Sequence, residues 1–158
     1  MPKMIPNLWF DKEGEEAAAF YVSIFPNSKI TGVQRYTEAG PGEPGTVMLV
    51  QFELDGQPFV AINGGPMFTF DEAISFEIDC ADQDEVDYYW NALTSDGGEE
   101  SQCGWCKDRF GLSWQVVPAG WEAVMTDPDP ERVDRAMKAM FSMRKLDIAA
   151  LRAAADGA

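Results

Sequence analysis

The chain has 158 residues, a hydrophobic fraction of 46% and no histidine, a composition that favours a folded domain over disorder. Its formal net charge is −15, which argues against nucleic acid or anionic lipid as a partner. A cationic ligand is compatible with this charge but is not required by it. No apolar run approaches the roughly 18 residues that span a bilayer, and no secretory signal is visible, so we expect a cytoplasmic protein with no membrane partner.

Residues 5–25 and residues 73–93 match each other without a gap. Each segment begins with alternating apolar residues, which predict a half-buried strand, and continues into an amphipathic helix. The ends of the two copies also match when Gly56 is aligned with Gly111, and both predict a turn followed by a strand. The chain therefore contains an internal repeat.

The middle of the first copy predicts two strands, within residues 29–40 and 45–54, joined by the glycine-rich loop 38–45. This loop is interpreted as a hairpin connection and not as a phosphate or adenosylmethionine site, because no helix follows it and its prolines lack amide donors. In the second copy, residues 97–108 predict the middle strand of a shorter meander. Both copies are interpreted as β-α-β-β-β modules.

These modules, at about residues 1–66 and 70–119, are expected to form one domain over residues 1–126, followed by a helical tail over residues 127–158. Asp129 is a plausible N-cap for the first tail helix, because Pro130 follows at a position that favours proline. A second short helix is expected to begin at Asp147. The predicted fold class is therefore α+β.

Five segments carry a resemblance to a known family. The chain is similar to the PhnB-like branch of the vicinal oxygen chelate superfamily, which includes glyoxalase I, bleomycin-resistance proteins and extradiol dioxygenases. Members of this branch have often been labelled 3-demethylubiquinone-9 3-methyltransferase. The resemblance implies the glyoxalase/bleomycin-resistance fold, in which two βαβββ modules form cup-shaped mixed sheets around a pocket, and it implies a homodimer. The segments are residues 8–30, 52–68, 73–80, 103–118 and 127–151.

Metal-using members of the superfamily take ligands from the first and last strands of the modules. The resemblance places these positions at Ile5, Val60, Ala73 and Gln115. Only Gln115 offers an oxygen there, whereas a divalent transition metal requires several imidazole, thiolate or carboxylate ligands. We therefore expect no metal and no cofactor, and a site built from oxygens around Glu77 and Asn7 stays open as an alternative.

Strand alternation predicts which side chains face the cup. Phe76 and Ile78 are expected on the core side, which leaves Glu77 on the cup side. Glu77 is the candidate catalytic residue, because a buried carboxylate would have a raised pKa and could act as a base. The competing interpretation is an exposed or hydrogen-bonded acid at the rim. The predicted ligand-binding residues are Asn7, Trp9, Glu77, Ser113 and Gln115.

Cys103 and Cys106 form a C-x-x-C motif, expected to lie in a strand with the two side chains on opposite faces. A redox pair requires a helix N-terminus to lower the thiol pKa, and a zinc site requires about four ligands. We favour structural thiols over a redox pair and over a metal site.

Three functions remain open from the residues. The first is a metal-independent protein that binds a small organic molecule, as bleomycin-resistance proteins do. The second is an enzyme that uses a pocket carboxylate such as Glu77 for proton transfer or isomerisation. The third is an interaction module with a vestigial pocket. The sequence specifies neither the ligand nor whether any reaction is catalysed.

Overall fold

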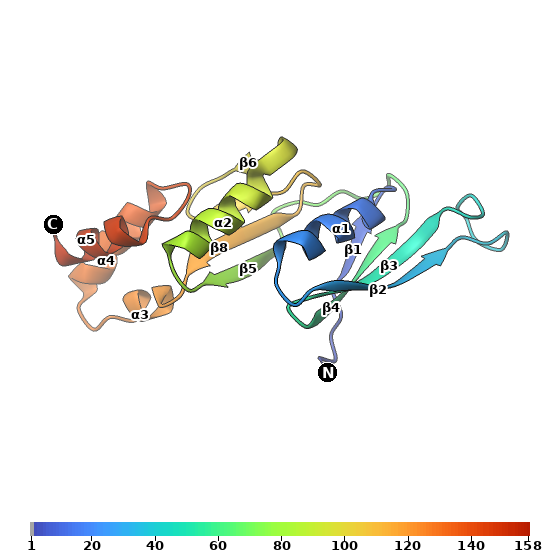
Figure 1. Ribbon diagram of the computed structural model, residues 1–158. Helices are drawn as coiled ribbons and strands as arrows, with labels where there is room; N and C mark the ends of the chain where they lie inside the picture. Colours follow the sequence, from blue (N-terminus) through green and yellow to red (C-terminus); the bar gives the residue numbers. More distant parts are fainter. Residues whose placement is uncertain (1) are drawn as a thin grey trace. The chain divides into compact units, whose positions relative to one another are not determined.

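Two compact units make up the chain, and the boundary between them lies between Phe70 and Asp71. The computed structural model describes residues 2–158 (Figure 1). Each unit contains one four-stranded mixed sheet and a helix that packs on one face of it. None of the helices within residues 2–158 has the length and hydropathy needed to cross a bilayer.

The first unit has the predicted β-α-β-β-β order. Its strands lie in the order β1-β4-β3-β2, with β1 parallel to β4 and the other pairs antiparallel. The turn predicted before the last strand is confirmed: it lies at Asp55-Gly56, where both residues have positive φ, as a type I′ hairpin turn requires. The elements are β1 (Asn7–Phe10), α1 (Gly14–Ile24), β2 (Lys29–Arg35), β3 (Val47–Leu54) and β4 (Gln57–Asn63).

Aromatic rings form the centre of the first core. Tyr21 of α1 is fully buried and stacks on Phe52 of β3 with the ring centroids 6.3 Å apart. Phe52 in turn stacks on Phe59 of β4 at 5.5 Å. Leu8 and Phe10 are buried, at 6% and 4% exposure. Trp9, between them in β1, therefore faces away from this core.

The second unit repeats the module, and the α+β fold class with two βαβββ modules is confirmed. Its strands lie in the order β5-β8-β7-β6, with β5 parallel to β8. The helix α2 begins after Asp82, whose side chain accepts a hydrogen bond from the amide of Glu85. The elements are β5 (Ser75–Cys80), α2 (Gln83–Thr94), the 3-10 helix η1 (Ser95–Gly97), β6 (Glu99–Glu100), β7 (Trp105–Lys107) and β8 (Ser113–Pro118).

One prediction for the second unit is wrong. Residues 97–108 do not form a single middle strand but the two short strands β6 and β7, joined by a turn. Cys103 and Gly104 lie in this turn with φ angles of 59° and 83°, a left-handed conformation that interrupts a strand. Cys103 is therefore not a strand residue, contrary to expectation, whereas Cys106 is.

The two modules also differ in register by two residues. Asn7 pairs with Val60 in the first sheet, so the repeat predicts that Ser75 pairs with Gln115. Instead, Ser75 pairs with Ser113 and Glu77 pairs with Gln115. Because the side-chain period of a strand is two, this shift keeps every side chain on its predicted face and moves only its neighbours along the strand.

Three helices follow β8, and they pack with the second unit. The predicted helix starts are confirmed, since the side chains of Asp129 and Asp147 cap α4 and α5. Gln83 of α2 holds the tail by donating to the carbonyl oxygen of Leu146 and accepting from the amide of Ile148. The sequence did not predict α3. The helices are α3 (Trp121–Met125), α4 (Pro130–Phe141) and α5 (Ile148–Asp156).

Candidate functional site

The second sheet has one face under α2 and one face without a helix, which we call the open face (Figure 1). Ile78, Trp114 and Val116 are buried on the helix side, so the residues between them point to the open face. Glu77 and Gln115 are therefore neighbours on the open face, as the strand alternation predicted.

Two rows of cross-strand neighbours cross the open face. In one row, Trp105 of β7 pairs with Gln115, which pairs with Glu77 of β5. The other row crosses all four strands, and its members are Glu99 of β6, Lys107 of β7, Ser113 of β8 and Ser75 of β5.

Within these rows, the Gln115 side-chain amide donates a 2.9 Å hydrogen bond to Ser75 Oγ. Glu77 is exposed. The enzyme hypothesis required a desolvated Glu77, and the open face of the chain does not bury this carboxylate. Glu77 therefore has the position predicted for a ligand contact, at the exposed end of the Trp105-Gln115-Glu77 row.

Ser113 is the unusual member of the site. Ser113 is 1% exposed, and within residues 2–158 its Oγ has no hydrogen-bond partner. A buried hydroxyl without a partner costs about 1–3 kcal/mol, which is why such groups are rare in folded proteins. Ser113 lines a hollow of about 130 Å³, together with Glu72, Glu99, Glu100, Ser101, Trp105, Cys106 and Lys107.

Charged side chains surround this hollow. The Lys107 ammonium is hydrogen-bonded to Glu72, and this contact raises the pKa of Lys107 and lowers that of Glu72. Glu100 accepts a 2.8 Å hydrogen bond from Trp90 Nε1 and lies 3.7 Å from an Arg144 guanidinium nitrogen. The residues that line the hollow thus include three glutamates and one lysine.

Asp108 positions the two strands that carry Lys107 and Ser113. It is 2% exposed, and its carboxylate accepts hydrogen bonds from the amides of Phe110 and Leu112 and from Trp114 Nε1. The sequence analysis did not single out Asp108. The available signal was an aspartate three residues before Gly111, since this spacing is typical of a type I turn.

Asn7 and Trp9, the other two predicted ligand-binding residues, belong to the first unit. The Asn7 side chain donates to the carbonyl oxygen of Ile5. Trp9 Nε1 donates a 3.0 Å hydrogen bond to the carbonyl oxygen of Gly65, and its ring meets Phe68 edge-on at 5.0 Å. Trp9 therefore already uses its only polar group to hold the loop that follows β4.

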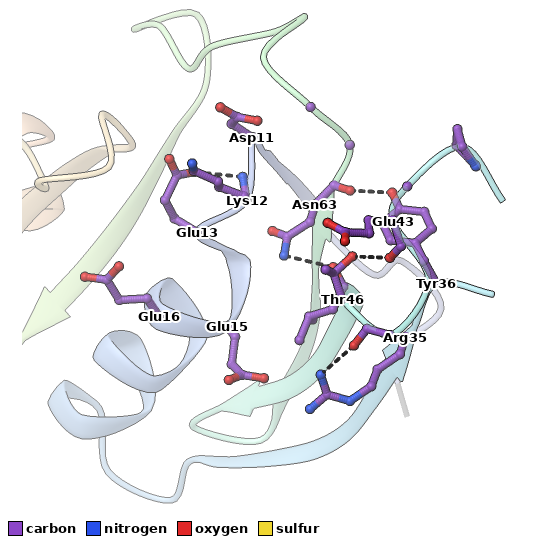
Figure 2. Close-up of a pocket in the computed structure, with 16 residues that line it drawn as sticks. Asp11, Lys12, Glu13, Glu15, Glu16, Arg35, Tyr36, Glu43, Thr46 and Asn63 are labelled. Atoms are coloured by element: carbon purple, nitrogen blue, oxygen red, sulfur yellow. Dashed lines mark hydrogen bonds between the residues drawn. The ribbon is translucent and has the colours of Figure 1, made fainter. Parts of the chain in front are cut away.

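The first unit contains a larger hollow of about 920 Å³ that the sequence analysis did not predict. It lies between the start of α1 and the glycine-rich loop that joins β2 to β3 (Figure 2). Tyr36 donates a hydrogen bond to the carbonyl oxygen of Asn63, and Gly42 is so close to the Tyr36 ring that a Cβ would overlap it. The charged lining residues are Asp11, Lys12, Glu13, Glu15, Glu16, Arg35 and Glu43.

A transition metal does not fit the positions that the superfamily uses for ligands. Ile5 and Ala73 precede their strands and, like Val60, carry no donor atom in the side chain. Gln115 contributes a neutral amide, and its nitrogen donates a hydrogen bond to Ser75 Oγ. No group of three or more Cys, Asp or Glu residues within residues 2–158 is arranged to hold a metal ion.

The three cysteines are free thiols. Burial, together with nearby carboxylates, raises the pKa of Cys80 and of Cys106 from 9.0 to about 12. Burial also raises the pKa of Cys103. Since a redox pair requires a lowered thiol pKa, these shifts favour structural thiols.

We expect iodoacetamide to alkylate Cys103 first at pH 8, because Cys103 is half-buried whereas Cys80 and Cys106 are at most 1% exposed. Their pKa of about 12 also gives about a thousandfold less thiolate than the ordinary value of 9.0. Peptide mass spectrometry locates the label, and Cys103→Ser is the control. Equal labelling of Cys106, or a Cys103–Cys106 disulfide, contradicts this expectation.

The same pKa shifts predict how stability depends on pH. Between pH 9 and pH 12 the folded state keeps thiol protons that the unfolded state has lost. The Cys80 and Cys106 contributions to the free energy of unfolding therefore decrease as the pH rises through this range, and they are complete below pH 9.

Comparisons with known proteins identify the family. Residues 2–117 match the family model described as 3-demethylubiquinone-9 3-methyltransferase. The structure of the PhnB protein from Bacillus cereus has 35% identity and a TM-score of 0.68, and the alignment covers 75% of this chain and 100% of that one. A search of curated proteins found no match.

More distant structures share the fold. Protein PA1353 from Pseudomonas aeruginosa has 18% identity and a TM-score of 0.61, with 75% of this chain and 98% of that one covered. The fosfomycin resistance protein FosX from Listeria monocytogenes has 17% identity and a TM-score of 0.55, with 77% and 94% covered. The chain belongs to the 3-demethylubiquinone-9 3-methyltransferase family and is PhnB-like.

Proposed function

We propose that the protein binds a small organic molecule on the open face of the second sheet, without a metal ion. The observation that carries this proposal is Ser113 Oγ, which is buried, has no partner within residues 2–158 and lines a hollow. Buried hydroxyls are almost always hydrogen-bonded in folded proteins, so a ligand that bonds to Ser113 would remove an unfavourable feature of the free protein.

The composition of the open face supports the same function. An aromatic ring lies beside a few polar side chains, which is the usual composition of a small-molecule site. Trp105 supplies the ring, and Glu77, Ser113 and Gln115 supply polar groups whose neighbours are set by the β7-β8-β5 register.

The donor groups support metal independence. A divalent transition metal would require several strong ligands, and the four positions that the superfamily uses offer one carboxamide oxygen. A metal bound by oxygen ligands around Glu77 is the alternative, and the experiment below separates the two.

Neither proton transfer nor methyl transfer is part of the proposal. A general base on this face would be Glu77, which is exposed and not buried as the enzyme hypothesis requires. Methyl transfer from adenosylmethionine would require a glycine-rich turn between a strand and a helix, whereas the glycine-rich loop of this chain joins β2 to β3.

We expect an NMR screen of small organic fragments, run on ¹⁵N-labelled protein with EDTA present, to give at least one saturable ligand. Its largest amide shifts should fall on β5, β7 and β8, because these strands carry the open face. Ser113→Ala should weaken that ligand about fivefold, which corresponds to the loss of one neutral hydrogen bond. Asn91→Ala, an exposed change on α2, is the matched control.

Two results would contradict the proposal. In the first, the saturable ligands shift amides only outside β5, β7 and β8. In the second, binding disappears with EDTA and returns when Mn²⁺, Ni²⁺ or Zn²⁺ is added, which would favour the oxygen-ligated metal site.

The proposal includes a homodimer. Several large apolar side chains are more than half exposed in the chain, and contact with a second copy would bury such groups. The diffusion coefficient of the same NMR samples reports the oligomeric state, and we expect the value for two chains. The exposed side chains are Met4, Met67, Phe68, Ile74 and Phe141.

A further inference from the structure

We infer that the hollow beside Ser113 recognises an organic cation with N–H groups, such as a primary ammonium or an amidinium. This inference rests on the proposed function and names the chemical class of its ligand. Three features of the hollow support it: the sign of the charge around it, the free hydroxyl of Ser113 and the Trp105 ring.

The charge around the hollow is negative. Three glutamates and one lysine line the hollow, namely Glu72, Glu99, Glu100 and Lys107. The Arg144 guanidinium lies 3.7 Å from Glu100, so carboxylates still outnumber cations here. Lys107 is already bonded to Glu72, and Glu99 lies opposite Lys107 in the β6–β7 ladder. Glu72, Glu99 and Asp71 all raise the pKa of Lys107, which is the effect that a negative surrounding potential has on a cation.

Binding of an anion in this hollow would be unfavourable. To reach Lys107 the anion would have to displace Glu72 and approach Glu99, with like charges at close range. A cation gains attraction from the same carboxylates and leaves the Lys107–Glu72 pair intact. The charge pattern therefore selects for positive ligands.

Ser113 and Trp105 add two directional contacts to this electrostatic attraction. The Ser113 hydroxyl oxygen has lone pairs that an N–H group can use, and within residues 2–158 no other donor does so. Trp105 lines the same hollow, and an indole face attracts a cation through its quadrupole. An ammonium or amidinium group can donate to Ser113 while it lies against the ring, which a metal ion cannot do.

The size of the hollow limits the group that enters it. A volume of about 130 Å³ equals about four water molecules at their volume in the liquid. This is enough for one ammonium or amidinium group with a short carbon stem. The rest of a larger ligand would extend along the row of Trp105, Gln115 and Glu77 on the open face.

The test uses n-butylammonium with two probes of matched size, 1-butanol and butyrate. Each is titrated into the full-length ¹⁵N-labelled protein, and the amide shifts of residues 105–107 and 113–115 are followed. We expect saturable shifts with n-butylammonium alone. Binding should weaken when NaCl is raised from about 25 mM to about 300 mM, because salt screens the carboxylates.

Two variants locate the interaction. Glu99→Gln should weaken n-butylammonium binding about fivefold, the upper range for an exposed charge pair, and Ser113→Ala should weaken it about fivefold through the lost hydrogen bond. Glu122→Gln removes the same charge from an exposed position on α3 and should leave the dissociation constant unchanged.

Stronger saturable binding of butyrate or 1-butanol at these amides would overturn the cation inference and leave small-molecule binding in place. Equal weakening by Glu99→Gln and Glu122→Gln would also overturn it, because the attraction would then come from the net charge of the protein. If none of the three probes saturates at these amides, the cation inference fails, and the fragment screen decides separately whether the proposed function stands.

Discussion

Replacing Asp108 by alanine is expected to lower the free energy of unfolding by about 4 kcal/mol, because three donors lose their acceptor at once. The three donors are the amides of Phe110 and Leu112 and the Trp114 indole nitrogen. Asp108 is 2% exposed, so water cannot replace the lost bonds without opening the core. Urea unfolding monitored by tryptophan fluorescence measures the change, and a loss below about 1 kcal/mol contradicts it.

A double-mutant cycle isolates the bond between Asp108 and Trp114. Asp108→Asn keeps one acceptor oxygen for the amides and places an NH₂ group opposite Trp114 Nε1, which lies 2.9 Å from Oδ2 in the native protein. Trp114→Phe removes the indole donor, so Asp108→Asn should be less destabilising in that background. We expect a coupling energy of about 1.5 kcal/mol, and simple additivity would show that the indole bond contributes nothing.

Asp108→Asn should also affect the proposed binding site. Asp108 holds the turn between β7 and β8, and these strands carry Lys107 and Ser113 as directly paired residues. A more mobile turn would hold the Lys107 and Ser113 side chains less rigidly relative to each other. Asp108→Asn should therefore weaken n-butylammonium binding, although Asp108 does not line the hollow.

Replacing Gly14 by alanine is expected to cost about 3 kcal/mol, although alanine favours a helix by about 1 kcal/mol. A Cβ on Gly14 would lie 2.6 Å from Asn63 Oδ1 and 3.3 Å from the Ala61 Cβ. Asn63 cannot easily retreat, because its Oδ1 accepts from the Gly14 amide and its Nδ2 donates to the carbonyl oxygen of Val47. The first turn of α1 would have to move away from β4.

Thermal unfolding of four variants tests this expectation: Gly14→Ala, Asn63→Ala, the two combined, and Glu15→Ala. Glu15→Ala, an exposed change in the same helical turn, should change the free energy of unfolding by less than about 0.5 kcal/mol. Gly14→Ala combined with Asn63→Ala should be less destabilising than the sum of the single changes, because the second removes the crowded amide. A neutral or stabilising Gly14→Ala would show that the space around α1 adjusts without cost.

Local patterns predicted the secondary structure well. Alternation placed Trp9, Glu77 and Gln115 on the strand faces that lack a helix, and Asp129 and Asp147 marked the starts of α4 and α5. These features depend on neighbours within a few residues, through the side-chain period of a strand and the unpaired amides of a first helical turn. The internal repeat extended the prediction to the order of the elements, because similar sequences form similar modules.

The short elements were harder to predict. The turn at Cys103-Gly104 divides residues 97–108, a segment whose pattern predicts one strand. Nothing in the composition of this segment requires Cys103 to adopt a positive φ. The amides of both residues donate to carbonyl oxygens of the tail, at Met143 and Arg144. These contacts join residues about forty positions apart in the sequence, and they favour the turn over a continuous strand.

The amino-acid sequence by itself determined the α+β class, the two modules and the two main tail helices. Only the tertiary structure decided the two-residue shift between the sheets, the hydrogen bonds of Asp108 and the burial of Ser113 without a partner. The physical reason is distance along the chain. Periodicity and capping act over one or two turns, whereas register and burial depend on contacts between segments that only folding brings together.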